Sequence, residues 1–365
     1  HLEHRRQRQM CIRDSDSLGR ITPPESGAVV VMDVRTGEVI SMVSSPTYDP
    51  NIFTERLLTR DWRRLQEHPR NPLLNRVTAG AYAPGSTFKM VVALAALEAG
   101  IISEKTRHFC NGSMDLGNRT FHCWFEDGHG SMNVIKALER SCDVFFYEVA
   151  LKTGIQRIKN MALRLGLGFP TGIDIPGEKP GIIPSHDWKL ATHGVVWTPG
   201  ETVNAGIGQG YVLTTPLQLA VMIARLANAE LAVTPSLQVL DRPPAFEPLN
   251  ISPAALWTIR KGMFQVTHGG LGTARAHNLP SSFGGMAGKT GTVQVKRITK
   301  EQREAGITKN IERPWKERDH ALFVGYAPVK NPRYAVSVVV EHGGSGSSMA
   351  APIAKATLQR VLQTR

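Results

Sequence analysis

Residues 27–34 read Gly-Ala-Val-Val-Val-Met-Asp-Val, and residues 39–43 read Val-Ile-Ser-Met-Val. Apolar and β-branched residues dominate both runs, and a polar turn with Gly37 separates them, which is typical of a β-hairpin. Strand signals return only towards the other end of the chain, at residues 290–295, 320–326 and 334–341. We therefore expect one sheet that is assembled from both ends of the chain.

Helical patterns account for much of the remaining sequence. They are expected at residues 84–100, 134–152, 216–229 and 348–362. Two groups of strands with helices between them predict an α+β fold that carries a helical lobe at about residues 100–280. A cleft between the sheet and this lobe is the expected place for a functional site.

Composition limits the class of protein. The chain of 365 residues is 41% hydrophobic and 20% charged, as in ordinary globular proteins. Residues 1–19 show no strand or helix period, so we expect a tail or foreign segment there and one domain at 20–365, with its sheet from 27–45 and 288–342. No apolar stretch reaches the roughly 18 to 20 residues that span a bilayer. The net charge of +12 does not predict nucleic-acid binding, because the basic residues are scattered.

The first chemical motif is Ser86-Thr87-Phe88-Lys89. At the start of a helix, this spacing places a hydroxyl and an amine on one face, about one turn apart. A partly desolvated amine can accept the proton of the serine and so activate it as a nucleophile. The motif is weak by itself, because serine and lysine often occur at this spacing by chance.

Two further motifs strengthen this interpretation. Ser141-Cys142-Asp143 lies in the middle of the chain, and Lys289-Thr290-Gly291-Thr292 lies at the start of a late strand. All three motifs in this order are far rarer than any one of them. The sequence therefore predicts an enzyme with a serine nucleophile.

These motifs resemble those of the transpeptidase domain of the penicillin-binding proteins, and more closely those of the elongation-type class B members. The resemblance runs from Gly27 to the C-terminus. It implies the fold shared with serine β-lactamases, an antiparallel five-stranded sheet flanked by helices plus a helical lobe. The stretches that carry it are residues 27–38, 82–89, 206–211, 287–292 and 319–323.

The resemblance also implies roles for the catalytic residues. Ser86 would be the acylated nucleophile and Lys89 its general base. Ser141 would relay a proton to the leaving amine, and Lys289 would add a positive field. Asp143 is grouped with them, although an ionised aspartate only accepts hydrogen bonds. Either it pairs with Lys89 or it is kept neutral.

The strand motif would bind substrate through Thr290, Gly291 and Thr292. Thr290 would hold the terminal carboxylate of the substrate together with Ser141. The backbone N–H groups of Ser86 and Thr292 would form an oxyanion hole, because donors at a strand edge beside a helix N-terminus suit a tetrahedral oxyanion.

The function implied is that of a peptidoglycan D,D-transpeptidase, which cross-links stem peptides through a Ser86 acyl-enzyme and is acylated by β-lactams. One alternative is a D,D-carboxypeptidase or β-lactamase, which passes the acyl group to water. Another is a sensor domain that acylates once without turnover. The resemblance also implies the periplasmic face of the inner membrane, an N-terminal transmembrane anchor absent from this chain, and partners in an elongation complex that includes a glycosyltransferase.

The last candidate site contains three of the four cysteines. Cys110, Cys123, His129 and Cys142 are spaced by 12, 5 and 12 residues, and three thiolates with one imidazole make a complete tetrahedral zinc set. Elongation-type relatives resemble this arrangement, so we expect structural zinc and no catalytic cofactor. The alternatives are a disulfide between Cys110 and Cys123 with Cys142 as a buried thiol, free thiols throughout, or a different histidine ligand, either His122 or His108.

Overall fold

The computed structural model describes residues 26–54, 57–239, 244–296 and 310–364. The predicted tail at residues 1–19 lies outside this part of the chain. Among the helices that the structure describes, none combines the length and the apolar character needed to cross a membrane.

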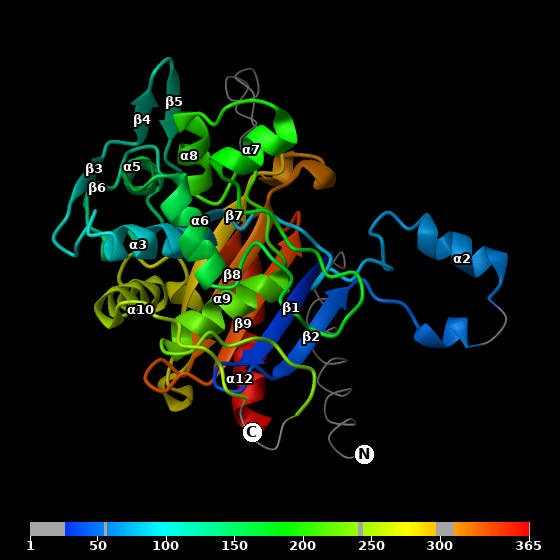
Figure 1. Ribbon diagram of the computed structural model, residues 1–365. Helices are drawn as coiled ribbons and strands as arrows, with labels where there is room; N and C mark the ends of the chain where they lie inside the picture. Colours follow the sequence, from blue (N-terminus) through cyan, green and yellow to red (C-terminus); the bar gives the residue numbers. More distant parts are fainter. Residues whose placement is uncertain (1–25, 55–56, 240–243, 297–309, 365) are drawn as a thin grey trace.

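One antiparallel sheet of five strands organises the molecule (Figure 1). The first strands of the chain pair directly with the last, since Ala28 lies opposite Val339 and Val29 opposite Val338. The predicted α+β fold with a sheet built from both ends is therefore confirmed. In spatial order the strands are β2 (Val39–Ser45), β1 (Ser26–Asp33), β9 (Tyr334–Glu341), β8 (His320–Ala327) and β7 (Ala287–Val293).

Helices cover both faces of this sheet. Val29 and Val31 share one core cluster with Ile353 and Leu358 of α12 (Ala351–Thr364). The alternate residues Ala28 and Val30 pack with Leu217 and Ala220 of α9 (Pro216–Asn228). Because successive strand residues point to opposite faces, a sheet that is covered on both sides needs nearly continuous apolar strands.

The helical lobe lies beside β7. It contains α3 (Lys89–Glu98), which packs against α5 (Asp143–Thr153), α6 (Ile155–Arg164) and α10 (Pro253–His268). Two helices, α7 (His186–His193) and α8 (Pro199–Gly206), complete it, to the right of α5 in Figure 1.

The prediction of one helix at residues 134–152 was wrong. The structure has α4 (Val134–Glu139) and α5 with a break between them, where Ser141 adopts a φ of 55°. A non-glycine residue in this left-handed region ends an α-helix. The break places Ser141 and Asp143 at the start of α5 instead of inside a helix.

The sequence also failed to indicate strands between residues 108 and 132. The structure pairs β3 (His108–Cys110) with β6 (Gly130–Met132), and β4 (Ser113–Leu116) with β5 (Arg119–His122). These strands have three or four residues each, too few to show a period of two.

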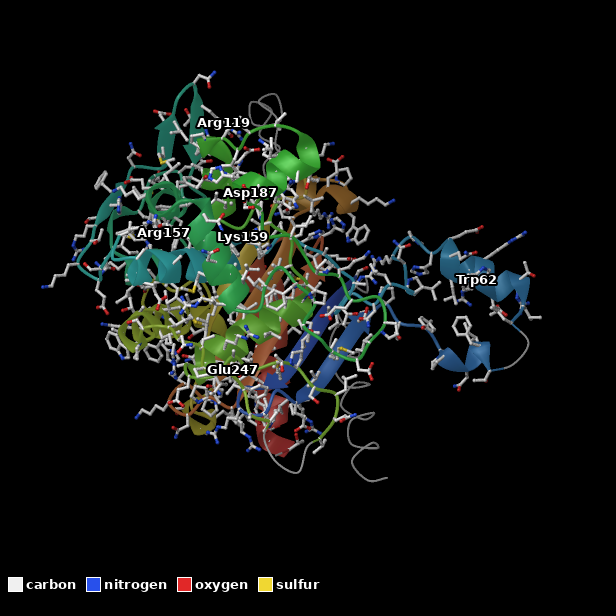
Figure 2. The ribbon with its side chains drawn as sticks, viewed as in Figure 1. Trp62, Arg119, Arg157, Lys159, Asp187 and Glu247 are labelled. Atoms are coloured by element: carbon white, nitrogen blue, oxygen red, sulfur yellow. The ribbon has the colours of Figure 1, made fainter. Side chains whose placement is uncertain are left out.

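An arm formed by residues 46–75 extends away from the sheet (Figure 1). It carries α2 (Thr59–Gln66), and Figure 2 shows Trp62 on it, far from the lobe. The remaining short helical turns are η1 (Pro50–Phe53), η2 (Gly85–Phe88), η3 (Arg275–His277), η4 (Ser281–Phe283), η5 (Asn310–Glu312), η6 (Trp315–Glu317) and η7 (Gly346–Ala350).

Candidate active site

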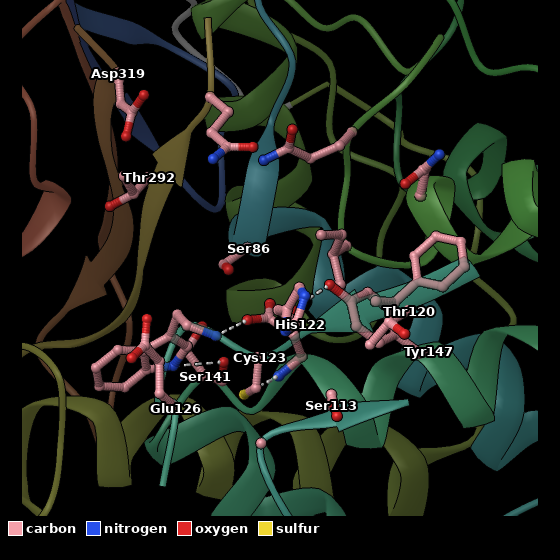
Figure 3. A pocket seen from close by; sticks show the side chains of 18 of the residues that line it. Ser86, Ser113, Thr120, His122, Cys123, Glu126, Ser141, Tyr147, Thr292 and Asp319 are labelled. Carbon is pink, nitrogen blue, oxygen red and sulfur yellow. Dashed lines mark hydrogen bonds between the residues drawn. The ribbon is translucent and has the colours of Figure 1, made fainter. Parts of the chain in front are cut away.

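A cleft of about 1130 Å³ lies between β7 and the helical lobe, where the α+β plan predicted it. All three sequence motifs contribute to its wall, because Ser86, Ser141 and Thr292 line it (Figure 3). Segments that are far apart in the chain thus meet at one cleft.

Ser86 lies in η2, which runs directly into α3. Gly85 before it has a φ of 54°, and a Cβ there would lie 2.7 Å from Cγ2 of Val293, so only glycine fits this turn beside β7. Ser86 is half-buried and lines the cleft, whereas Lys89 is completely buried beneath it. The predicted helix start therefore presents the hydroxyl to the cleft and keeps the amine inside.

The amine of Lys89 is held by the start of α5. Its Nζ donates to the backbone oxygen of Ser141 at 2.9 Å, to Oγ of Ser141 at 3.2 Å and to Oδ1 of Asp143 at 2.7 Å. These contacts join the first motif to the second.

Lys289 of β7 approaches the same hydroxyl. Its Nζ donates to Oγ of Ser141 at 2.9 Å and to the backbone oxygen of Thr290 at 2.9 Å. Complete burial, together with repulsion from Lys89, holds the pKa of Lys289 well below its usual range. The third motif thus joins the other two, and Ser141 receives donors from both lysines.

Asp143 pairs with Lys89, which is one of the two alternatives considered from the sequence. Its second oxygen, Oδ2, accepts the backbone N–H of Trp124 at 2.9 Å. Because both oxygens of this buried side chain are engaged, Asp143 orders the site around Lys89.

After Lys289, successive side chains of β7 point alternately towards the cleft and away from it, as in any β-strand. Thr290 and Thr292 line the cleft, whereas a Cβ on Gly291 would lie 3.1 Å from both Leu322 Cβ and Thr87 Cγ2 on the packed side. Thr292 Oγ1 accepts the N–H of Gly346 at 3.4 Å. Gly291 therefore allows close packing of β7 and does not reach the cleft with a side chain.

Thr273 and Trp124 are among the cleft residues that carry no motif in the sequence and were missed. Thr273 forms a hydroxyl contact with Thr290 at 2.7 Å between their Oγ1 atoms, and its backbone oxygen accepts from Ser347 Oγ at 2.6 Å. Trp124 also lines the cleft and is 58% exposed. For Trp124, the only sequence signal was an aromatic residue directly after the predicted ligand Cys123.

Cys110, Cys123, His129 and Cys142 meet in one buried cluster. One ligand atom from each lies within 4.8 Å of all the others. Nδ1 of His129 lies 3.7 Å from Sγ of Cys110 and 3.4 Å from Sγ of Cys123. These separations and the donor set fit four ligands around one tetrahedral zinc ion.

The other histidines considered as ligands lie apart from this cluster. His108 Nδ1 contacts Glu148, and His122 is exposed. A hydrogen bond from Cys142, supported by one from His129, lowers the pKa of Cys123 despite its burial, and the same thiol contact raises the pKa of Cys142. The three cysteines are buried thiols in this structure.

The fold and the three converging motifs define a class, the active-site-serine domains of the penicillin-binding and serine β-lactamase type. The family described as penicillin binding protein transpeptidase domain matches residues 27–359. The chain belongs to this family.

Its relatives confirm the resemblance to the elongation-type members. Peptidoglycan D,D-transpeptidase MrdA of Haemophilus influenzae is 37% identical over 353 residues, which cover 93% of this chain and 53% of that protein. MrdA of Escherichia coli K12 is 37% identical over 335 residues, or 88% of this chain and 52% of that protein. The chain thus spans about half the length of these curated relatives.

Solved structures agree with the sequence relatives. Pseudomonas aeruginosa PBP2 in complex with WCK 5153 has 38% identity and a TM-score of 0.83, covering 97% of this chain and 73% of that chain. The complex of PBP2 and MreC from Helicobacter pylori has 31% identity and a TM-score of 0.86, covering 96% of this chain and 62% of that chain.

Proposed function

We propose that this chain is the catalytic part of a peptidoglycan D,D-transpeptidase that works through a Ser86 acyl-enzyme and is acylated by β-lactams. One observation carries the proposal: the buried amines of Lys89 and Lys289 both donate to Ser141 Oγ, on the cleft that Ser86 also lines. A nucleophile, a base and a proton relay are thus available in one place.

In the first half of the reaction, Oγ of Ser86 attacks the penultimate D-alanyl carbonyl carbon of a stem pentapeptide. The serine proton passes to the unprotonated amine of Lys89 as the Oγ–C bond forms. The tetrahedral oxyanion is stabilised by the backbone N–H groups of Ser86 and Thr292. The C–N bond then breaks, and the leaving D-alanine receives a proton through Ser141.

In the second half, the amine of a neighbouring stem attacks the ester carbonyl. Its proton returns through Ser141 and Lys89 to Oγ of Ser86 as the ester bond breaks. Until D-alanine leaves in the first half, Thr290 and Ser141 would hold the terminal carboxylate of the donor peptide beside the positive field of Lys289. The enzyme is regenerated, and one amide bond replaces another.

The ion pairs formed by carboxylates at the cleft support transfer of the acyl group to an amine over its transfer to water. A β-lactamase needs a positioned base for deacylation, such as a glutamate. Of the three carboxylates that line the cleft, Asp143 is paired with Lys89 at 2.7 Å, Asp319 is paired with Arg313 at 3.2 Å, and Glu126 is exposed. A D,D-carboxypeptidase, a β-lactamase or a non-turnover sensor remains the alternative.

Measuring how much of the acyl group passes to an acceptor amine and how much to water distinguishes the transpeptidase from these alternatives. The protein is incubated with a donor pentapeptide, with and without an amine-bearing acceptor peptide, and the products are separated by mass. We expect the cross-linked dimer to form with release of one D-alanine per bond. Hydrolysed tetrapeptide as the only product would favour the carboxypeptidase, and a stable acyl-enzyme without product would favour the sensor.

We also propose that Cys110, Cys123, His129 and Cys142 hold structural zinc. A set of four protein ligands leaves no open position, so the ion would stabilise the fold and supply no chemistry to the substrate. Cys142 directly precedes Asp143, and Sγ of Cys123 accepts the N–H of Asp143 at 3.4 Å. The cluster therefore supports the start of α5.

For the whole protein, we propose a membrane-anchored enzyme at the periplasmic face of the inner membrane, with residues 20–365 as its transpeptidase domain. Partners are expected among elongation-complex proteins. Two similar structures support this: a PBP2 complex with MreC, and a peptidoglycan synthase complex that coordinates polymerization and crosslinking.

A further inference from the structure

Ser141 has an unusual backbone that its own sequence does not explain. Its φ of 55° lies in the left-handed region, where a residue with a side chain is strained. Such strain persists only where surrounding groups fix the conformation. The orientation of the Ser141 hydroxyl therefore depends on what holds its peptide.

Two donors converge on the backbone oxygen of Ser141. Lys89 Nζ donates to it at 2.9 Å and Trp124 Nε1 at 3.0 Å. Nε1 also lies 3.1 Å from the backbone oxygen of Arg140, so the indole N–H faces two consecutive peptides of the helix break. Lys89 holds the segment from inside the protein, and Trp124 holds it from the cleft side.

Trp124 also contacts the other residue of the motif. Its backbone N–H donates to Oδ2 of Asp143 at 2.9 Å. One residue thus bonds to both sides of Cys142, through a side-chain donor and a backbone donor. This arrangement fixes the distance between Ser141 and Asp143 from outside the catalytic motifs.

The exposure of Trp124 argues against a simple packing role. Its side chain is 58% exposed on the cleft, although burial of an indole would be favourable. Its hydrogen bonds, rather than burial, therefore define its position. The ring also contacts His129 edge to face, with centroids 5.4 Å apart, which limits its rotation.

We infer that Trp124 is a positioning residue for the acylation step, an inference that rests on the proposed function. Its indole N–H holds the Ser141 peptide in the left-handed conformation and so aims the Ser141 hydroxyl between Lys89, Lys289 and the leaving group. Trp124 does not exchange protons and does not need to bind the substrate. It acts through Ser141.

The test is the kinetics of benzylpenicillin acylation, separated into the noncovalent dissociation constant and the first-order acylation constant. Trp124→Phe keeps an aromatic ring and removes the N–H donor. We expect the acylation constant to fall about tenfold, as the loss of one hydrogen bond predicts, with the dissociation constant within about threefold of wild type. Rates are expressed per acylatable protein, so that an unfolded fraction does not contribute.

Two further variants make the result specific. In Trp124→His, Nε2 of the imidazole occupies the ring position of the indole Nε1, so we expect much of the acylation constant to return. Trp257→Phe is the matched control, because Trp257 is 57% exposed and contacts Lys261 on α10, outside the cleft lining. Its acylation should match wild type.

Two outcomes would overturn the inference. One is an acylation constant for Trp124→Phe within about twofold of wild type, and the other is a weaker dissociation constant with unchanged acylation, which would make Trp124 a substrate-binding surface. If Trp124→Phe does not fold, a benzothiophene analogue of tryptophan at position 124, with sulfur in place of N–H, carries the same test. Absence of acylation in wild type would overturn the proposed function as well.

Discussion

The amine of Lys89 lies 2.7 Å from Oδ1 of Asp143, and the two side chains are 0% and 11% exposed. This ion pair joins the first turn of α3 to the first residue of α5. It makes Asp143 the counter-ion of Lys89 whenever that amine carries its third proton, as after the serine proton is transferred, and its other oxygen is bound to the backbone of Trp124. Each oxygen of Asp143 therefore already accepts one hydrogen bond from within the protein.

Asp143→Asn should therefore weaken both stability and acylation. The substitution leaves the buried Lys89 without a counter-ion and turns one acceptor into a donor that faces the N–H of Trp124. We expect a loss of about 2 to 4 kcal/mol in unfolding free energy, and acylation slowed at least about tenfold. Denaturant unfolding and penicillin acylation measure the two effects.

Asp187→Asn is a matched control for this change. Asp187 lies in the first turn of α7, as Asp143 does in α5, but it is exposed (Figure 2). Its substitution should alter stability by no more than about 0.5 kcal/mol. An Asp143→Asn protein that is as stable as this control would contradict the ion-pair role.

Lys289→Met should separate stability from activity. Burial and repulsion from Lys89 lower the pKa of Lys289, so its charge is unfavourable inside the folded protein. Methionine fills a similar space without this cost. We expect a higher melting temperature at pH 7 and acylation slowed by at least about a hundredfold, because the donor from Lys289 Nζ to Ser141 Oγ is lost.

The destabilisation of the folded protein by Lys289 should depend on pH. Between the lowered pKa and the usual value near 10.5, the unfolded chain binds a proton at Lys289 that the folded chain does not. The stability of wild type therefore rises with pH through this window, and the advantage of Lys289→Met should shrink as pH approaches 10. A variant less stable than wild type at pH 7 would argue against a destabilising lysine.

His320 should make the fold sensitive to acid. Burial, with repulsion from His342, lowers the pKa of His320 to about 4. Its Nδ1 accepts the backbone N–H of His342 at 3.0 Å, which protonation of that nitrogen would prevent. As pH falls from about 6.5 to 4, the unfolded chain gains the proton first, and stability should drop by up to about 3 kcal/mol.

His320→Gln should reduce this acid-dependent loss, as measured by denaturant unfolding at pH 7, 5.5 and 4.5. His186→Gln is the control, since His186 is exposed on the first turn of α7. Equal pH slopes in His320→Gln and wild type would show that another group is responsible.

Removal of metal should lower the melting temperature and slow acylation indirectly. Elemental analysis of protein purified without chelator should give about one zinc per chain, and chelation should loosen the start of α5 next to Cys142. Cys123→Ser should lose the metal. Less than about 0.2 zinc per chain, with no free thiols at Cys110 and Cys123, would favour the disulfide.

A nearby histidine offers the control for this site. His122 directly precedes Cys123 but is exposed, and its backbone oxygen, not its ring, contacts Tyr147. His122→Ala should keep the full metal content. Loss of zinc in this variant would identify His122 as a ligand in place of His129.

The sequence predicted the sheet and the three motifs because their signals are local. Apolar strands that are covered on both faces are continuous in sequence, as in residues 334–341, and a serine three residues before a lysine at a helix start must share its face. The folded chain brings the three motif segments together at the cleft.

The features that were missed depend on distant contacts. The break at Ser141 is fixed by donors from Lys89 and Trp124, which lie 52 and 17 positions away in the chain. Thr273 is positioned at the cleft by hydrogen bonds with Thr290 and Ser347, which lie 17 and 74 positions away in the chain. Trp124 and Thr273 belong to no sequence motif. Without the contacts made by Lys89 and Trp124, helix propensity alone favoured an unbroken helix at residues 134–152.

The covalent adduct with penicillin tests the central claim most directly. Wild-type protein, Ser86→Ala and Ser113→Ala are incubated with benzylpenicillin and measured intact by mass spectrometry, with melting curves recorded for each. Ser113 is the control, because it also lines the cleft, on β4 (Figure 3). We predict one adduct per chain in wild type and Ser113→Ala, mapped to Ser86, and none in a fully folded Ser86→Ala. An adduct that persists in folded Ser86→Ala, or is absent from folded wild type, would contradict the account.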